Sequence, residues 1–498
     1  MGRFVALGAV LVACGALAVG TWRATARPQD VGRAALQSAA CSDTFAAGDW
    51  PRFGRTAGRS NDAPSGPSGV QLAHMRRLRI TLPGTVDSSP ILMRGIKIGG
   101  HTHDLLVVTT TYGRSLGIDV HSGRILWRYT PPGIAKWNGT SQITTASPVA
   151  DPDLQYVYVA SPDGRVHKLV IATGREIRSA GWPALLTFDP SHEKLPAALN
   201  LAGCMVFVAT GGYTGDAPPY QGHLVALDRH TGHILHMFNT LCANRRVLIH
   251  PTSCAWSGSA IWGRAAPVID PATGNLLIAT GNGAWNGRTL WGDSVLELSP
   301  DAARLLQNYT PVNQAALNVN DADLGSTAPA VLPPIRGWHL AVQGGKDRVL
   351  RLLNLRRLNQ FGGAGARTGG QLATATLPGP LFSAPAIVPD AHGALVLVGT
   401  QSSLSAFRVA VSSRPTLRLL WRRGVGSTSP VVAGHSIYAY DPGGSGLHVY
   451  SLPAGRLMRV LPAGPGHWSS PIVAAGVVAL PEGDANSHAS TGVLDLYR

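Results

Sequence analysis

The sequence predicts an all-β fold, an eight-bladed β-propeller of four-stranded blades, closed by an N-terminal strand that completes the C-terminal blade. Three observations predict it. Charged residues make up only 14% of the 498 residues, while 59 Gly and 36 Pro supply turns throughout. This is too turn-rich for a helical protein and too apolar for a disordered one. A short proline motif recurs from residue 85 onward, and one β-type segment precedes its first copy.

The recurring motif, a small residue, a proline and then an apolar run, marks the start of each unit. Its proline stands at seven positions: Pro90, Pro148, Pro267, Pro329, Pro385, Pro430 and Pro471. The long interval after the second copy holds two periods, with a divergent copy near Leu201–Gly212, so eight units are expected. Each unit continues into further short strands joined by Gly- or Asp-bearing turns. Such even spacing is typical of a propeller rather than a sandwich.

The two ends of the repeat region predict how the ring closes. The last unit, which begins at Pro471, ends one strand short of a four-stranded blade. Met75–Gly84 is a lone strand with no unit before it. Pairing the two would leave no open sheet edge, as a ring requires.

The N-terminal segment is predicted to be an export signal or membrane anchor, residues 1–26. Nineteen uncharged residues, Phe4–Trp22, would span about 28 Å as a helix. A cleaved signal, an uncleaved anchor and lipidation at Cys14 all remain open, and each delivers the rest of the chain outside the cytoplasm. Residues 27–75 are expected to form a flexible tether and irregular lead-in with little core, before a propeller at residues 76–498.

Four cysteines follow the leader: Cys41, Cys204, Cys242 and Cys254. An even number in an exported chain favours disulfides, and Cys242 with Cys254 is the expected local pair. No CxxC or CxxCH occurs, so the sequence supports neither a zinc ribbon nor covalently attached haem.

The charge excludes one class of partner. The formal net charge is +15, but the basic residues are scattered singly, which argues against nucleic-acid binding. Membrane contact is expected through the N-terminal segment only. Arg outnumbers Lys by 37 to 5. A lysine that stands in a polar cluster was therefore kept against a strong compositional preference for arginine.

Two stretches carry a resemblance to a known family. "GIDVHSGRILW" (Gly117–Trp127) and "ALDRHTGHILH" (Ala226–His236) resemble the blade signature of the quinoprotein (PQQ-dependent) alcohol dehydrogenase-like propellers. The resemblance implies an eight-bladed ring in which Asp and Thr-Gly hold a tight turn and the Trp packs on the next blade. Here most copies lack that Trp.

The resemblance also implies cofactor-binding residues. "IWGRAAPVIDPATGNLLIATGNGAWNG" matches the run that places a Trp under the quinone beside a calcium ion. By that match Trp262 is the platform for PQQ, and Asn282 is a calcium ligand through its amide oxygen. Lys346, in "GGKDRVLRLL", matches a lysine that points at the quinone oxygens and would stabilise the charge that builds up there.

A catalytic carboxylate is expected in "NDADLGSTAPAVL". Asp323 aligns with the second Asp of the family's HD-x-W-D segment, Asn320 stands where the first should be, and Asp321 lies one place off. Either aspartate offers the general base that an alcohol oxidation needs. The family's acidic calcium ligand falls at Ala217, so Asp216 beside it is taken, with Asn282, as a metal ligand. The adjacent Cys-Cys pair that roofs the quinone is absent.

Two functions remain open at this stage. One is an exported PQQ- and calcium-dependent dehydrogenase that oxidises a small-molecule or polymeric alcohol, or a sugar-like hydroxyl, and passes electrons to an external acceptor. The other is a non-catalytic scaffold that binds an envelope protein or glycan, like the outer-membrane assembly lipoprotein of the same family. Fold alone does not choose between them.

Overall fold

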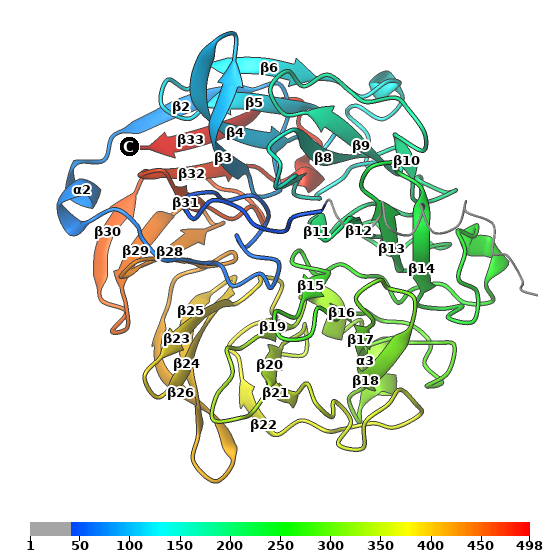
Figure 1. Cartoon of the computed structure of the whole chain (residues 1–498). Helices are drawn as coiled ribbons and strands as arrows, with labels where there is room; N and C mark the ends of the chain where they lie inside the picture. The colour runs from blue at the N-terminus through cyan, green and yellow to red at the C-terminus, as the bar shows by residue number, and fades with distance from the viewer. Residues whose placement is uncertain (1–40) are drawn as a thin grey trace, which may run out of the picture. The chain divides into compact units, whose positions relative to one another are not determined.

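The computed structural model describes residues 41–498, and the compact unit Ser42–Arg498 holds every element named below. Eight β-sheets of this unit are arranged as blades around a ring (Figure 1). The predicted all-β fold with eight blades is therefore confirmed. The leader predicted at residues 1–26 lies outside the described residues. Within the described part, no helix combines the length and apolar character needed to cross a membrane.

The first four blades follow the chain in order. Blade 1 consists of β3 (Ile91–Ile98), β4 (His101–Thr109), β5 (Ser115–Asp119) and β6 (Ile125–Tyr129), and blade 2 of β7 (Val149–Ala150), β8 (Tyr156–Ser161), β9 (Arg165–Val170) and β10 (Ala184–Leu185). Blade 3 consists of β11 (Asn200–Ala202), β12 (Met205–Ala209), β13 (His223–Asp228) and β14 (Ile234–Asn239), and blade 4 of β15 (Val268–Ile269), β16 (Leu276–Ala279), β17 (Val295–Leu298) and β18 (Leu305–Tyr309).

The last four blades complete the ring. Blade 5 consists of β19 (Ala330–Val331), β20 (Leu340–Gln343), β21 (Val349–Asn354) and β22 (Ala373–Thr376), and blade 6 of β23 (Ala386–Asp390), β24 (Gly393–Thr400), β25 (Ser403–Val411) and β26 (Pro415–Arg423). Blade 7 consists of β27 (Val431–Ala433), β28 (Ser436–Asp441), β29 (Gly446–Ser451) and β30 (Leu457–Leu461), and blade 8 of β31 (Ile472–Ala474), β32 (Val477–Glu482), β33 (Gly492–Tyr497) and β2 (Arg77–Leu82).

Short elements join and flank the blades. They are β1 (Asp62–Ala63), α2 (Gly69–His74), α3 (Gln314–Val319) and the 3₁₀ turns η1 (Ile134–Lys136), η2 (Pro251–Ser253), η3 (Leu324–Ser326) and η4 (Ala485–Ser487). β1 pairs in parallel with β27 and makes that sheet five-stranded. Ser68 caps α2 by accepting from the Gln71 N–H, while the Gln71 side chain accepts from the Ser68 N–H, which satisfies both amides.

Each repeat proline stands immediately before the first strand of its blade. Pro267 precedes β15 and Pro385 precedes β23, for example. These first strands lie nearest the centre of the ring in Figure 1. Strands in the middle of a blade, such as β5 and β16, are buried along their whole length because neighbouring blades pack face to face. The hydrophobic core therefore lies between blades, as in the cluster shared by blades 1, 7 and 8.

The signature turns have a direct chemical cause. In blade 3 the Asp228 carboxylate accepts hydrogen bonds from the Thr231 N–H at 2.7 Å and the Thr231 hydroxyl at 2.9 Å. Gly232 follows with a left-handed φ of 78°, which glycine adopts without steric cost. In blade 1, Trp127 donates from Nε1 to the Ile171 carbonyl of blade 2 at 2.9 Å, so this Trp packs on the next blade as the resemblance implies.

The ring is joined by its two terminal strands. β2 pairs antiparallel with β33 along six residues, from Arg77 opposite Tyr497 to Leu82 opposite Gly492. Arg77 also contacts the buried Asp495 at 2.6 Å and Glu482 at 2.8 Å. Ladder hydrogen bonds and ion pairs together hold the ends of the propeller to each other.

Residues 49–63 correct one expectation from the sequence. We expected little core before residue 76, but Trp50 and Phe53 are 1% and 2% exposed. This stretch, the crossing segment, runs across the middle of the ring as the dark-blue trace of Figure 1. Its backbone bonds to the first strands of five blades, at Leu92, Ala150, Ile269, Ile387 and Val432. It lacks a periodic pattern because it pairs with these five blades in turn.

Arg59 anchors the crossing segment. It is 1% exposed and donates to four carbonyls: Ala265 at 3.0 Å, Phe53 at 2.8 Å, Ala198 at 3.1 Å and Leu199 at 3.0 Å. Burial and the neighbouring Arg52 lower its pKa. The side chain therefore ties the segment to the beginnings of blades 3 and 4.

Replacing Arg59 is expected to destabilise the whole propeller. Arg59→Met would leave buried carbonyls without donors, at a cost of about 3–5 kcal/mol in the free energy of unfolding. Arg55→Met is the matched control, because Arg55 shares the left-handed backbone but is less buried, and it should cost about 1 kcal/mol. Urea unfolding of both variants checks this. Equal losses would contradict the role given to Arg59.

Candidate functional site

A cavity of about 620 Å³ opens where the first strands of the blades begin. Its walls come from the segments just before those strands, with Asp87 from blade 1, Lys194 from blade 3, Trp262 from blade 4, Asp323 from blade 5 and Trp468 from blade 8. Residues far apart in the sequence therefore meet because each opens its own blade at the same end of the ring.

All six residues predicted for the site line this one cavity. They are Asp216, Trp262, Asn282, Asp321, Asp323 and Lys346. The structure thus brings together the six residues predicted as catalytic, cofactor-binding or metal-binding, including Asp216, which stands beside the position of the family's acidic ligand.

Trp262 is held by the backbone segments that follow β12 and β16. Its Nε1 donates to the Gly212 carbonyl at 3.1 Å. A Cβ on Gly211 would come within 2.8 Å of the indole, and a Cβ on Gly281 would also come within 2.8 Å. Any larger residue at either glycine would displace the ring. The remaining, half-buried surface of the indole lines the cavity and offers a flat aromatic platform.

Lys346 lies between two carboxylates beside that platform. Its Nζ is 2.9 Å from Asp321 Oδ1 and also forms an ion pair with Asp323 Oδ2. The same Nζ is 5.8 Å from the Trp262 ring centroid, within the range of a cation–π contact. Burial opposes the charge of Lys346, but the two carboxylates outweigh it and raise its pKa.

Asp323 is fully buried, and Asn282 holds it in place. The Asn282 N–H donates to Asp323 Oδ1 at 2.6 Å. Burial raises the pKa of Asp323 to about 6, against the lowering effect of Lys346 and the Asn282 N–H, and Asp321 adds to the rise. Asp321 by contrast is more than half exposed. A carboxylate with a pKa near 6 at the edge of a cavity suits proton transfer at neutral pH.

The side-chain oxygen of Asn282 has no donor. Asn282 Oδ1 is buried and finds no hydrogen-bond partner within residues 41–498. A buried carbonyl oxygen left unpaired is costly, and a hard cation such as calcium accepts neutral amide oxygens as ligands. Asn282 therefore fits the metal-binding role implied by the resemblance.

Asp216 supplies a further carboxylate. It has a left-handed φ of 53° in a loop of blade 3. Burial raises its pKa, as does Asp321, while Lys346 and a hydrogen bond from Tyr220 lower it. Burial and Asp321 both favour the protonated form of Asp216. A cation bound between the two carboxylates would favour their ionised forms.

Sequence reasoning missed a second charged cluster that lines the cavity. Asp87 is 1% exposed and pairs with Arg264 Nη2 at 3.1 Å and His467 Nδ1 at 2.7 Å. Burial alone would raise its pKa, but Arg264 and His467 lower it to about 2. Arg264 stands two residues after Trp262, but its partner Asp87 lies 177 residues away, and no local pattern connects them.

Lys194 was also missed, although a signal for it existed. It is one of only five lysines, and the rarity that drew attention to Lys346 applies to it equally. Two backbone hydrogen bonds with Gly211, at 2.8 and 3.0 Å, place it beside the platform. Burial and the nearby Arg264 lower its pKa to about 8, against Asp87 and Asp216.

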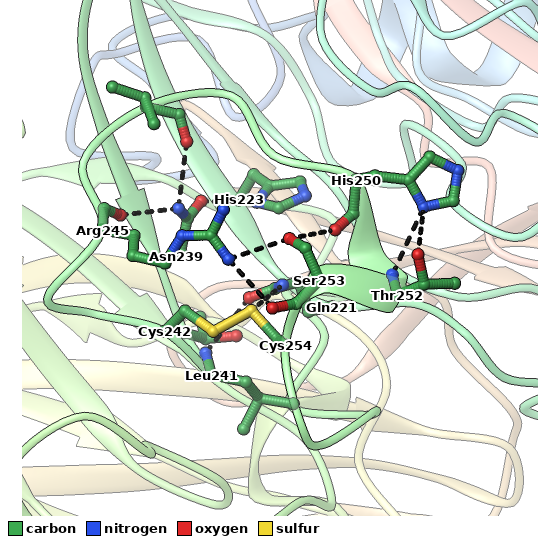
Figure 2. The surroundings of a disulfide bond; sticks show 12 residues. Gln221, His223, Asn239, Leu241, Cys242, Arg245, His250, Thr252, Ser253 and Cys254 are labelled. Atoms are coloured by element: carbon green, nitrogen blue, oxygen red, sulfur yellow. Dashed lines mark hydrogen bonds between the residues drawn. A yellow bond between two sulfur atoms is a disulfide. The ribbon is translucent and has the colours of Figure 1, made fainter.

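A disulfide closes the loop between residues 242 and 254, which is linked through Gln221 to the segment that carries Lys194. Cys242 and Cys254 form the bond predicted from their spacing. Gln221 donates from Nε2 to Cys254 Sγ at 3.2 Å and accepts from the Leu241 N–H at 3.2 Å, as Figure 2 shows. The Gln221 N–H donates in turn to the buried Glu193 at 3.0 Å, the residue next to Lys194. The bond thus stabilises the backbone that carries the lysine.

Asp293 is a second buried carboxyl group that interacts with Asp323. It is fully buried, accepts from the Leu324 N–H at 3.1 Å, and donates its own N–H to the Gly281 carbonyl at 2.8 Å. Burial raises its pKa to about 7, against the Leu324 N–H, and Asp323 adds to the rise. Asp293 therefore binds its proton more tightly in the folded chain than in the unfolded one.

This shift predicts a pH dependence of stability. The stability from protonated Asp293 is complete below about pH 4 and is lost as the pH rises through about 7. Asp293→Asn cannot ionise, keeps an acceptor for Leu324 and tolerates the left-handed backbone. Its stability relative to the wild type should therefore increase from pH 4 to 8, by up to about 4 kcal/mol.

The measurement is the difference between the urea midpoints of the two proteins at pH 4, 5, 6, 7 and 8. The folded state does not hold the Asp293 proton if this difference is the same at every pH. The same conclusion follows if the wild type becomes more stable relative to the variant above pH 7.

Known proteins resemble this chain in sequence over about half of its length and in fold over most of it. No model of a known protein family matches the sequence. The quinohemoprotein alcohol dehydrogenase ADH IIB of Pseudomonas putida is 26% identical over 251 residues, 48% of this chain and 34% of that protein. The match thus covers about a third of the relative's length.

Two solved structures share the architecture. The quinohemoprotein alcohol dehydrogenase of Comamonas testosteroni has a TM-score of 0.66 at 16% identity, over 90% of this chain and 80% of that chain. A europium-containing methanol dehydrogenase has a TM-score of 0.66 at 14% identity, over 91% and 98%. The expected resemblance to the quinoprotein alcohol dehydrogenase-like eight-bladed propellers is confirmed, and at these identities the structures show a shared fold.

Proposed function

From this shared fold we propose that the protein is an exported PQQ-dependent dehydrogenase that oxidises an alcohol or a sugar-like hydroxyl. The observation that carries the proposal is the meeting of six separately predicted residues in one cavity. That cavity has an aromatic platform, a lysine between two carboxylates and an unpaired amide oxygen. A propeller that only binds a protein or glycan needs no such buried cluster, so the scaffold alternative is not favoured.

The residues present fit PQQ and calcium. The flat face of Trp262 suits a planar quinone, and Lys346 beside it carries the positive charge that quinone oxygens attract. Asn282 Oδ1, with the carboxylate of Asp216, offers oxygen ligands that calcium takes. When bound, PQQ supplies a two-electron acceptor for hydride from the alcohol carbon.

Asp323 serves as the general base in this proposal. Its ionised form accepts the hydroxyl proton of the alcohol as the carbon gives up hydride, and Lys346 stabilises the carboxylate by direct contact. Asp321, which is more exposed, holds Lys346 from the other side. The chain has no CxxCH motif, so the electrons leave through an external acceptor.

We also propose that the chain acts outside the cytoplasm. The apolar run Phe4–Trp22 supports export at residues 1–26, and the disulfide between Cys242 and Cys254 suits an oxidising compartment. Residues 76–498 would then form the PQQ-binding propeller, with the membrane contacted only through the N-terminal segment. The substrate would be a small-molecule or polymeric alcohol.

Cofactor binding is expected to quench tryptophan fluorescence. The purified full-length protein, titrated with PQQ at fixed Ca²⁺, should show saturable quenching that EGTA weakens. Trp262→Ala and Lys346→Ala should each weaken binding by about 10-fold or more, since each removes a direct contact with the ring. Trp256→Ala is the control, because this indole is 56% exposed and does not line the cavity. No saturable quenching at high micromolar PQQ would contradict the proposal.

The pH profile should report Asp323. Because a base works when ionised, kcat/KM for an alcohol with an artificial acceptor should rise about tenfold per pH unit up to about pH 6 and then level off. Asp323→Asn should lower kcat by about 100-fold or more. Asp321→Asn should keep the rise near pH 6. A rise that persists in Asp323→Asn and vanishes in Asp321→Asn would reverse the two roles.

A further inference from the structure

Most charges in the cavity are neutralised by partners within the protein. Lys346 lies between Asp321 and Asp323, and Arg264 pairs with Asp87. Lys194 differs from both. Within the described residues it has no carboxylate at ion-pair distance and no hydrogen-bond acceptor for its Nζ, and it still lines the cavity. Its positive charge is available to a ligand.

The backbone of Lys194 is firmly placed. Its paired strand partner, Gly211, packs on Trp262. The preceding Glu193 is fully buried, accepts from the Gln221 N–H at 3.0 Å and pairs with His223 Nε2 at 3.2 Å. Figure 2 shows Gln221 beside the disulfide and His223 above it. The lysine therefore projects from a rigid base at one side of the aromatic platform, while Lys346 stands near the ring itself.

The surroundings of the ammonium explain why it lacks a partner. Lys194 Nζ is 5.8 Å from the Tyr213 ring centroid, and the Tyr213 hydroxyl is occupied as a donor to the Pro190 carbonyl at 2.9 Å. The charged groups that act on Lys194 are Arg264, Asp87 and Asp216. Arg264 already shares the charge of Asp87. A half-buried cation with these neighbours gains from an anion brought into the cavity.

We infer that Lys194 is an anion-binding residue that takes a carboxylate of a planar aromatic acid lying on Trp262. The inference rests on the proposed function, in which this acid is PQQ. It goes beyond that function because it assigns the binding of the acid's carboxylate to a residue outside the matched motifs. Lys346 is held by its two aspartates, so the two lysines have separate tasks.

The lowered pKa of Lys194 gives the inference a signature. A bound carboxylate favours the ammonium form, so affinity should fall as the pH rises past about 8. Lys194→Arg keeps the charge to much higher pH and should bind without this fall. Lys194→Met removes the charge but keeps the length of the apolar stem. Since burial disfavours the charged amine and no carboxylate pairs with it in the described residues, Lys194→Met should not lower the thermal unfolding midpoint at pH 7.

The test compares an acid with its ester. Full-length protein at fixed Ca²⁺ and pH 7 is titrated with PQQ and with the methyl esters of PQQ, following tryptophan fluorescence. Lys194→Met should weaken PQQ binding by about 10- to 100-fold, the usual value of a charge-assisted contact, and leave ester binding unchanged. Between pH 7 and 9 the wild type should lose about tenfold in PQQ affinity and Lys194→Arg should not. Lys136→Met, at an exposed lysine, is the matched control.

The outcomes separate the two claims. Wild-type protein that binds neither PQQ nor its ester overturns the proposed function, and the inference with it. Equal PQQ affinities of the wild type and Lys194→Met overturn only the inference. The same holds if Lys194→Met weakens the binding of PQQ and of its ester equally. Loss of PQQ affinity in Lys194→Met with ester affinity kept, and with rescue by Lys194→Arg, establishes the anion-binding role.

Discussion

The position of the whole site depends on one buried cation. Arg59 binds the carbonyls of Ala198, Leu199 and Ala265, which belong to the two segments that carry Lys194 and Trp262. A guanidinium has five donors in a rigid plane, so it fixes the distance between these segments as well as bonding each of them. Because a buried arginine without an acidic partner is costly, its retention is explained by this geometric role at the junction of blades 3 and 4.

A second constraint is the electrostatic balance of the cavity. Asp323 and Asp293 lie close together under Trp262 and Gly281, and burial raises the pKa of both. Two buried carboxyls that influence each other do not both ionise readily. The fold tolerates this because Asp293 keeps its proton near neutral pH, which leaves the negative charge on Asp323, where Lys346 can stabilise it. Burying these two carboxyls lowers the stability of the folded chain, and it leaves Asp323 as a carboxylate that can accept a proton.

The fold was predictable from the sequence where it rests on local chemistry. A proline before each first strand, or the Asp228-to-Gly232 turn, needs only neighbouring residues to be recognised. The crossing segment was not predictable, since its residues pair with the first strands of five different blades and leave no period. Trp262 and Lys346 were found because they sit in recognisable motifs. The pair of Asp87 with Arg264 exists only because the opening segments of blades 1 and 4 line the same cavity, and no sequence window contains both.

The charges that line the cavity are four carboxylates and, besides His467, three cations. Under the proposed function a calcium ion at Asn282 and Asp216 would leave the cavity positive, and Lys194 would be the cation without a partner. An anionic cofactor then restores the balance. Metal and cofactor should therefore bind with positive cooperativity, each improving the other's affinity by the same factor, as linkage requires. A neutral ester of the cofactor would lose the part of that coupling that depends on its charge.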